Sequence, residues 1–344
     1  MVEILKSLSV VAVGIIGFIA VLGGLYWLAS QLPEPWRERA RVAVFVGPAL
    51  ILLVGGLIIP SIVNLRLSFY TGNGLSPTKW YGLGNFRDIF TNDDNLMVLR
   101  NTVWWVLVVT AASVVIGIII ARFADKMRGE PIAKALIFLP TAISMVGAGV
   151  IWNFMYATKG NDPDKQFGLI TYFWMKLDPI LPGHQGPNYW LQDKRFFGID
   201  SNWLPGVNTF FIMAVIVWIQ AGFATVVISA ALKGVPDDLV EAAKIDGATE
   251  RQAFFKVVLP YVKGTIITVA TTILIAVMKI FDIIQTMGKG GSFGTSTIAN
   301  EMYEQSFTQD NKGRGAAWAV LLFLAVIPIV FINSRNQRAM REGR

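Results

Sequence analysis

The chain has 344 residues, of which 54% are apolar and 15% are charged. Soluble domains carry about a quarter charged residues, so this composition excludes an ordinary soluble protein and predicts a polytopic membrane protein. The absence of cysteine and the presence of a single histidine, His184, exclude disulfides, zinc–cysteine clusters and multi-histidine metal sites. A net charge of +7 fits either nucleic-acid binding or an oriented membrane protein, and the positions of the charges distinguish the two.

Seven apolar stretches are long enough to cross a bilayer, because about 20 apolar residues span its hydrocarbon core as a helix. We expect an all-α fold of about seven transmembrane helices at residues 8–30, 42–65, 103–121, 135–157, 208–232, 264–286 and 315–333. The first stretch is longer than the apolar region of a signal peptide and has no small-residue cleavage site after it. We interpret it as a retained, extra N-terminal helix within residues 1–41, ahead of a transmembrane domain at 42–344.

The positive charges concentrate in one set of alternate connections between these stretches. That set holds 16 Lys and Arg residues in 66 positions, whereas the other set holds 13 in 122 positions. Cytoplasmic connections are enriched in Lys and Arg, so we expect the N-terminus outside and the C-terminus inside. The charge then lies beside lipid and does not form a nucleic-acid patch. The dense set comprises 31–41, 122–134, 233–263 and 334–344.

An external connection at 158–207 is long and rich in Pro, Gly, Asn, Asp and Trp. Exposed aromatic rings are costly in water, so four aromatic residues favour an ordered extracytoplasmic cap with little regular structure over a flexible linker. These residues are Trp190, Phe196, Phe197 and Trp203. His184 lies in the same connection beside Pro and Gly, and no pattern around it indicates catalysis.

The cytoplasmic connection at 233–263 is unusually long and dense in helix signals. Pro236 suits a first helical position, and the two Asp residues after it favour the positive end of a helix dipole. Gly247 is a natural C-terminal stop. Thr249 with Gln252 forms a capping box that opens a second helix, which we expect to end before Pro260. The pair of short helices either lies on lipid headgroups or docks a cytoplasmic partner.

The motif residues of this connection are Glu241-Ala242-Ala243, Asp246-Gly247-Ala248 and Val257-Val258-Leu259-Pro260. They resemble the EAA loop of binding-protein-dependent ABC importer permeases, with Val257 in place of the usual Ile. Other stretches resemble the larger, maltose-type permease subunit of carbohydrate importers, although Ser292 stands where the family usually has Pro. They are Pro60 with Leu67-Ser68-Phe69, Gly84-Asn85-Phe86, Asn101-Thr102, Leu139-Pro140, Phe281-Asp282 and Gly290-Gly291 before Thr295. The resemblance covers about 42–344, and the insertion at 158–207 most resembles the α-glucoside branch.

The resemblance implies a type I ABC importer permease fold in the bacterial or archaeal cytoplasmic (inner) membrane, and no enzymatic activity in this chain. The implied partners are a second permease subunit, two cytoplasmic ATPase subunits and an extracytoplasmic solute-binding protein, with a carbohydrate as substrate. The chain lacks the phosphate-binding motif Gly-x4-Gly-Lys-Ser/Thr. ATP and Mg are therefore expected on the partner subunits and no cofactor on this chain.

The resemblance implies that ATP acts on this chain through a partner that presses on the 233–263 loop. The resemblance assigns coupling to the ATPases to Glu241, Ala242, Ala243, Asp246, Gly247, Leu259 and Pro260. Small side chains permit close approach of a partner, and glycine permits a sharp turn between the two helices. Glu241 is positioned either to pair with a cation of the partner or to remain a solvated helix charge paired with Lys244.

Lys279 and Asp282 lie at i and i+3 in the expected sixth span. Ionisable groups at membrane depth are costly and usually functional, so the two form either a structural ion pair or part of a substrate site. The resemblance places this region beside the sugar site, with substrate-binding candidates Lys279, Asp282, Gln285, Gln220, Asn153 and Tyr156. Trp152 and Trp218 would add aromatic faces or anchor span ends, and Pro140 predicts a kink.

Two other classes of function compete with this interpretation. A proton-driven secondary transporter would use Lys279 and Asp282 as a relay, but such transporters usually show inverted repeats, and no convincing repeat is visible. A membrane-embedded, glycosyltransferase-like enzyme would need carboxylates at the membrane surface. Asp93-Asp94 is the only external acidic pair, and we expect it to be a solvated turn.

Overall fold

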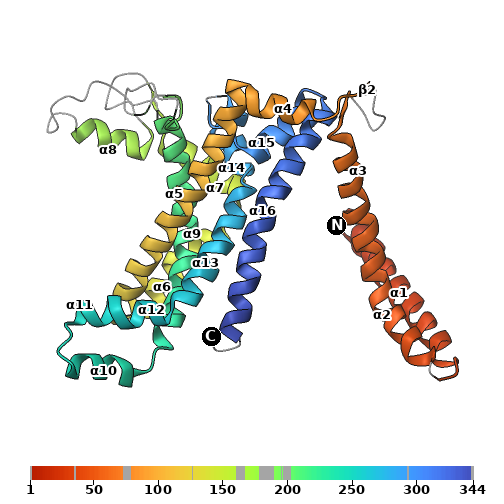
Figure 1. Cartoon of the computed structure of the whole chain (residues 1–344), viewed down its shortest axis with the longest axis horizontal. Helices are drawn as coiled ribbons and strands as arrows, with labels where there is room; N and C mark the ends of the chain where they lie inside the picture. The colour runs from red at the N-terminus through yellow and green to blue at the C-terminus, as the bar shows by residue number, and fades with distance from the viewer. Residues whose placement is uncertain are drawn as a thin grey trace. The chain divides into compact units, whose positions relative to one another are not determined.

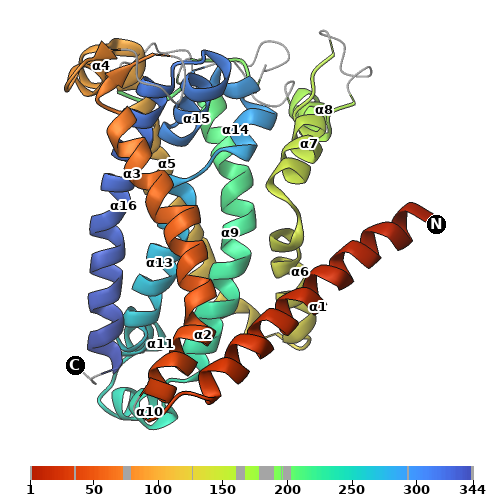
Figure 2. The same ribbon diagram turned by 90° about the vertical axis from the view of Figure 1, so that its right-hand side faces the viewer.

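The computed structural model describes residues 2–34, 36–72, 79–125, 127–159, 167–177, 190–194, 196, 203–292 and 294–341. The chain divides into two compact units, 1–66 and 67–344. Each unit is described by itself below, and Figures 1 and 2 show the helices of both in two views.

The first unit consists of long apolar helices. They are α1 (Val2–Ser30), α2 (Trp36–Leu53), the π-helical turn η1 (Val54–Ile58) and α3 (Ile59–Leu67), which runs to the boundary. α1 and α2 pack against each other, with the rings of Tyr26 and Phe45 5.7 Å apart. Arg41 lies over the Tyr26 ring at 5.5 Å. No residue of α2 is buried, as is typical of a helix that meets lipid.

The second unit is a helical bundle, and its described residues include a two-stranded antiparallel sheet in which Tyr70 pairs with Trp80 and Thr71 with Lys79. Figures 1 and 2 both place α10 and α11 at one end of this bundle and α4, α8 and α15 at the other. Its elements are β1 (Tyr70–Thr71), β2 (Lys79–Trp80), α4 (Gly84–Thr91), α5 (Asp93–Ala124), α6 (Glu130–Phe138), η2 (Leu139–Ala142), α7 (Met145–Met155), α8 (Leu169–Leu177), α9 (Val207–Lys233), α10 (Asp237–Ile245), α11 (Glu250–Ala253), η4 (Phe254–Val258), α12 (Leu259–Tyr261), α13 (Lys263–Met278), α14 (Asp282–Met287), η5 (Lys289–Gly291), α15 (Ile298–Tyr303), η6 (Glu304–Thr308) and α16 (Lys312–Arg341).

The core of the second unit forms where α5 packs along α9. Gly117 of α5 lies so close to α9 that an added Cβ would stand 2.6 Å from the Ala224 Cβ. At the far end from α10, Asn101 of α5 donates to the carbonyl oxygens of Gly294 and Ser296 at 2.7 and 3.1 Å. Small residues therefore set the spacing of the bundle, and buried amides fix its loops.

The expected number of spans is confirmed when bent helices are counted once. Five helices of the described residues are long and apolar enough to cross a membrane, namely Ser9–Ser30, Trp36–Leu67, Asp93–Ala124, Val207–Lys233 and Lys312–Arg335. Two bent pairs pass the same test, Glu130–Ala142 with Met145–Met155 and Glu250–Tyr261 with Lys263–Met278. All seven expected stretches overlap one of these segments.

Two expected spans are not continuous helices, which corrects the sequence-based boundaries. The span at 135–157 bends by 100° after a 3-10 turn that contains Pro140, since proline cannot donate to the helical ladder. The kink predicted at Pro140 is thus confirmed. The span at 264–286 breaks at 279–281, where Phe281 has φ −138° and ψ −59°, and α14 starts anew at Asp282.

The external connection is partly as expected. Trp190 is 5% exposed, donates its indole N–H to the Thr171 Oγ1 at 2.9 Å and packs edge-on against Phe211. Regular structure is also present, because α8 is a helix. Trp203 is 82% exposed, so the expectation that its ring is covered is wrong. Its carbonyl oxygen accepts a hydrogen bond from the Trp104 indole N–H. The predictions for His184 and Phe197 fall outside the described residues.

The acidic pair Asp93-Asp94 is not a turn. Both residues lie in the first turn of α5, where carboxylates complement the helix dipole. The Asn92 side chain caps this helix by accepting from the Asp94 amide at 2.9 Å.

Replacing Gly117 with Val is expected to lower the free energy of unfolding by about 1–3 kcal/mol, because the new side chain collides with Ala224 across the α5–α9 contact. Thermal unfolding of the purified chain in detergent measures the loss. Val103→Leu on the exposed face of the same helix is the matched control and should be neutral. Equal midpoints for the two variants would contradict the packing described.

Candidate functional site

The first helix of the 233–263 loop, α10, ends in a turn at Gly247 as predicted, but Pro236 is not its first helical residue. Pro236 has an extended backbone conformation and precedes Asp237, the first of two Asp residues in the first turn. At its C-terminus the amide of Gly247 donates to the Lys244 carbonyl and the amide of Ala248 to the Ala243 carbonyl, both at 3.0 Å. Gly247 has φ +87°, which a β-branched residue cannot adopt without strain.

The second helix carries the predicted capping box. The Thr249 hydroxyl accepts from the Gln252 amide at 3.3 Å, and the Gln252 side chain accepts from the Thr249 amide at 2.8 Å. We expected this helix to end before Pro260. Instead it runs through a π-helical turn to Tyr261. The wider π turn accommodates the proline, and Leu259 before it stays helical at φ −64° and ψ −43°.

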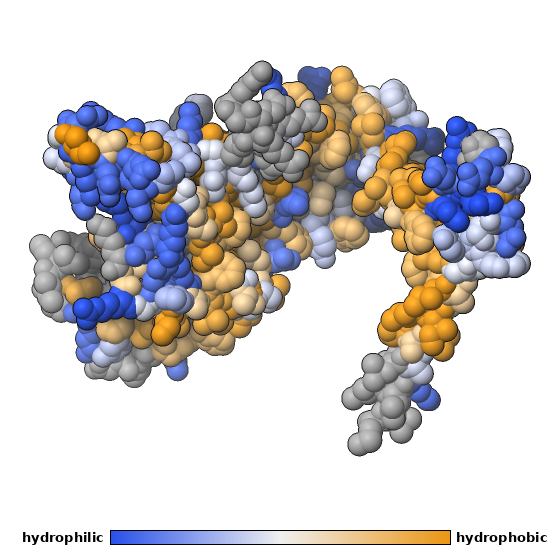
Figure 3. All heavy atoms as spheres, turned by 90° about the horizontal axis from the view of Figure 1, so that it is seen from below, coloured by the Kyte–Doolittle hydropathy of each residue, from blue (hydrophilic) through white to orange (hydrophobic). Residues whose placement is uncertain are grey.

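α10 is almost wholly uncovered. None of its residues is buried, and two of its apolar side chains are exposed, Ile245 at 85% and Leu239 at 42%. Figure 3 looks at the end of the molecule that carries α10 and shows hydrophilic residues gathered over it, with hydrophobic residues along the sides of the bundle. Within the described residues Glu241 has no ion-pair partner within 4.0 Å, so the pairing with Lys244 is absent. Apolar side chains exposed on a charged helix are typical of a docking element.

A network of polar side chains, which the sequence analysis did not predict, lies where the 233–263 loop leaves the helical bundle. The Lys134 ammonium of α6 contacts Asp125 at 2.6 Å and Glu130 at 2.5 Å. The Ser229 hydroxyl of α9 donates to Asp125 at 2.6 Å, and Lys233 pairs with Glu130. The network joins the end of α5, the start of α6 and the end of α9. Only the i, i+4 spacing of Glu130 and Lys134 gave a local signal.

The two helix breaks meet at one cavity of about 300 Å³. Three predicted substrate residues line it: Gln220 of α9, Lys279 after α13 and Asp282 at the start of α14. Lys279 and Asp282 are both exposed and flank the break instead of sharing a helix. Among the described residues no ion pair within 4.0 Å joins them. The remaining lining residues are Met145, Ile216, Ala276, Val277, Ile280, Phe281 and Ile283.

The other three predicted substrate residues lie elsewhere. Asn153 donates to the Thr286 carbonyl at 2.9 Å and so ties α7 to α14. Tyr156 is buried and donates to the Phe211 carbonyl at 3.3 Å. Gln285 donates to the Asn300 side chain at 2.7 Å and lines a separate, polar cavity of about 430 Å³.

The aromatic candidates pair with each other. Trp152 and Trp218 pack edge-on with ring centroids 5.5 Å apart. Neither lines the cavity at the breaks, so both stabilise the contact between α7 and α9.

Sequence comparison decides the family. The profile described as "binding-protein-dependent transport system inner membrane component" matches residues 113–341. The chain belongs to this family. The matched region contains both helix breaks and the whole 233–263 loop. The permease is thus a multi-pass membrane subunit of a transport system and not an enzyme, and neither the proton-driven transporter nor the glycosyltransferase interpretation has support.

Two curated relatives match the permease over most of their length. The osmoprotective compounds uptake permease protein GgtC of Synechocystis sp. is 38% identical over 88% of this chain and 100% of that protein. The alpha-glucoside transport system permease protein AglF of Rhizobium meliloti is 38% identical over 90% of this chain and 83% of that protein.

The permease also shares its fold with a solved structure. A bacterial alginate ABC transporter, in complex with an alginate pentasaccharide-bound periplasmic protein, has a chain similar at a TM-score of 0.68. The match covers 90% of this chain and 98% of that chain at 18% identity. The permease therefore has the ABC importer permease fold.

Replacing Lys134 with Met is expected to lower the free energy of unfolding by about 1–3 kcal/mol, since two neighbouring carboxylates lose their shared cation. The thermal midpoint in detergent measures the effect, with Lys263→Met at an exposed position as control. Adding Asp125→Asn and Glu130→Gln to Lys134→Met should restore much of the loss. A triple variant no more stable than the single one would contradict an electrostatic origin.

Proposed function

We propose that the permease is one of two membrane subunits of an ATP-driven importer of carbohydrates, with α-glucosides or related oligosaccharides as substrates. The single observation that carries this proposal is the uncovered α10 helix within a chain of this family. The substrate class is supported by the alpha-glucoside permease, which is 38% identical to this chain.

The proposed partners follow from two features of the chain, which lacks a phosphate-binding motif and exposes the α10 helix. A sister permease completes the pathway, an extracytoplasmic binding protein delivers the sugar, and two ATPase subunits bind ATP and Mg on the cytoplasmic side. The N-terminus lies outside and the C-terminus inside the cytoplasmic membrane. Support for this orientation comes from the second unit, in which α10 and the C-terminal end of α16 lie at the same end (Figure 1).

Coupling runs through the α10 element. Glu241 pairs with a cation of the ATPase, and the small side chains of Ala242 and Ala243 let the groove of that subunit approach the backbone. Asp246 and Gly247 end α10 in a fixed turn, and Leu259 and Pro260 continue the second helix toward α13. Closure of the ATPases must favour one conformation of the transport pathway by several kcal/mol. The connection from α10 through the second helix to α13 therefore has to be rigid.

The sugar contacts the cavity at the helix breaks. The side chains of Gln220, Lys279 and Asp282 offer donors and acceptors for sugar hydroxyl groups. Asn153 and Tyr156 act by positioning, since their hydrogen bonds hold α7 against neighbouring segments. Gln285 lies in the polar cavity of α14 to η6, which a sugar passes on its way in.

Replacing Gly247 with Val is expected to lower ATP-driven uptake at least tenfold while membrane insertion stays intact, because the turn at φ +87° can no longer form. Uptake of a radiolabelled α-glucoside into vesicles that contain the complete importer measures this. Gly247→Asn, which tolerates a left-handed conformation, is the matched control and should keep most activity. Glu241→Lys should also lose uptake; wild-type uptake in Gly247→Val or in Glu241→Lys would overturn the coupling role.

Replacing Asp282 with Asn is expected to raise the sugar concentration for half-maximal uptake about tenfold, because one strong acceptor is lost. Gln220→Leu should act in the same direction. Asp310→Asn, an exposed acidic residue away from the cavity, is the control. If Asp282→Asn and Asp310→Asn had the same half-saturation, the cavity would not contact substrate.

A further inference from the structure

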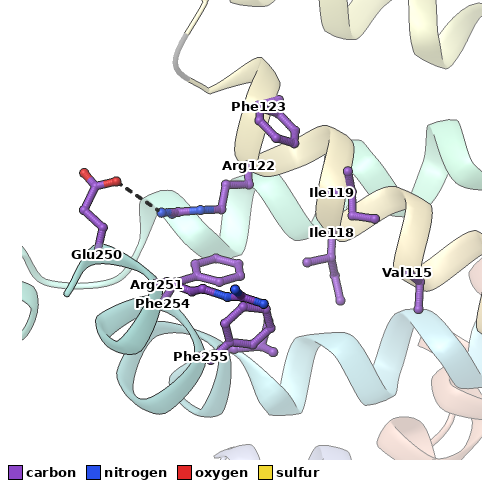
Figure 4. Close-up of a pocket in the computed structure, with 10 residues that line it drawn as sticks. Val115, Ile118, Ile119, Arg122, Phe123, Glu250, Arg251, Phe254 and Phe255 are labelled. Atoms are coloured by element: carbon purple, nitrogen blue, oxygen red, sulfur yellow. Dashed lines mark ion pairs between the residues drawn. The ribbon is translucent and has the colours of Figure 1, made fainter. Parts of the chain in front are cut away.

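An apolar crevice of about 570 Å³ lies between the end of α5 and the second helix of the loop (Figure 4). Aliphatic residues of α5 form one wall, and two phenylalanines of η4 face it. Its apolar lining residues are Val115, Ile118, Ile119, Phe123, Phe254, Phe255 and Leu259. Four of them, Val115, Ile119, Phe123 and Phe255, are themselves exposed.

Charged groups also line this crevice, at its α11 end. Arg122 lies with its guanidinium carbon 4.2 Å from the centre of the Phe254 ring, and one nitrogen is 3.9 Å from Glu250. Arg251 lies 6.0 Å from the centre of the Phe255 ring. Two guanidinium groups and one carboxylate leave an excess positive charge at this end. The stacking on the rings holds Arg122 and Arg251 in place.

The crevice has the polarity profile of one membrane leaflet. Arg122 is the first residue after the expected span 103–121, so it stands at the boundary between lipid and water. Val115 lies seven residues earlier on the same helix, which is about 10 Å deeper along its axis. Cationic groups therefore cap a slot that reaches into the hydrocarbon layer.

We propose that this crevice binds an anionic phospholipid of the cytoplasmic leaflet. Its phosphate lies on Arg122 and Arg251, because guanidinium groups match phosphate oxygens in pairs. One acyl chain lies between Ile119 and Phe255. Basic pockets on the cytoplasmic side of membrane helices recognise anionic headgroups in this way. The inference rests on the proposed function only for the orientation of this end toward the cytoplasm.

Occupancy of the crevice bears on coupling. The lipid would contact Phe254, Phe255 and Leu259, which belong to the segment between α10 and α13. Phe254 also lines a cavity shared with the start of α10. A bound lipid thus supports the second helix of the loop from the membrane side, while an ATPase engages α10 from the cytoplasm.

The test is native mass spectrometry of the delipidated importer complex, mixed with phosphatidylglycerol or phosphatidylcholine in detergent. Wild type should retain phosphatidylglycerol in preference. The double variant Arg122→Gln with Arg251→Gln should retain it about 25-fold less, since each cation near an anionic lipid contributes about fivefold. Ile119→Trp, which fills the crevice and keeps both charges, should also lose the lipid. Glu250→Gln, which frees Arg122 from its carboxylate, should retain at least as much as wild type.

The matched control is Arg128→Gln with Lys263→Gln, two exposed cations that do not line the crevice. Equal retention by the two double variants would overturn the proposal, as would equal retention of the two lipids by wild type. A side chain of the sister permease in the crevice of the assembled importer would overturn it too. Because retention is measured without ATP or sugar, an importer that transports normally but retains no lipid rejects this inference alone.

Discussion

A backbone that leaves the helical path at membrane depth must find new partners for its amide and carbonyl groups, because lipid offers none. The permease meets this constraint at both breaks. The Ser144 hydroxyl accepts from the Gly147 amide at 3.0 Å where α7 begins. The Thr297 hydroxyl donates to the Ile280 carbonyl at 3.1 Å where α13 and α14 separate. Such backbone is tolerated only where protein or a cavity surrounds it, so the breaks and the proposed sugar cavity coincide for one physical reason.

Helices and ion pairs of the second unit connect α10 to the segments around the breaks. α9 runs unbroken over 27 residues, about 40 Å, and three residues separate its end from α10. Lys134 and Lys233 bind the start of α6 to the ends of α5 and α9. These contacts join the segment before α10 to α6, which continues through the bend after Pro140 to α7. At the opposite end Asn101 holds the loop before α15 through its hydrogen bonds to the Gly294 and Ser296 carbonyl oxygens.

Sequence alone predicts the features of this permease that depend on neighbours along the chain. Apolar length locates the spans, and Pro236, Gly247 and Thr249 locate the two ends of α10 and the start of the second helix, whereas Pro260 does not mark the end of that helix. Pro140 predicts a bend, but the sequence does not predict that its angle is 100°. The break at 279–281 contains neither Pro nor Gly, so no local signal exists; it depends on Thr297 and on packing against α7. The Asp125–Lys134 contact is likewise tertiary, and only folding reveals it.

The same break explains why two opposite charges three residues apart do not neutralise each other. Lys279 caps the C-terminus of α13, where a cation is favourable, and Asp282 opens the N-terminus of α14, where an anion is favourable. Each charge is thus stabilised by the dipole of its own helix. In a continuous helix they would face each other at i, i+3 and pair. Breaking the helix keeps both groups exposed at a cavity, where an uncharged polyhydroxylated solute can use one as donor and the other as acceptor.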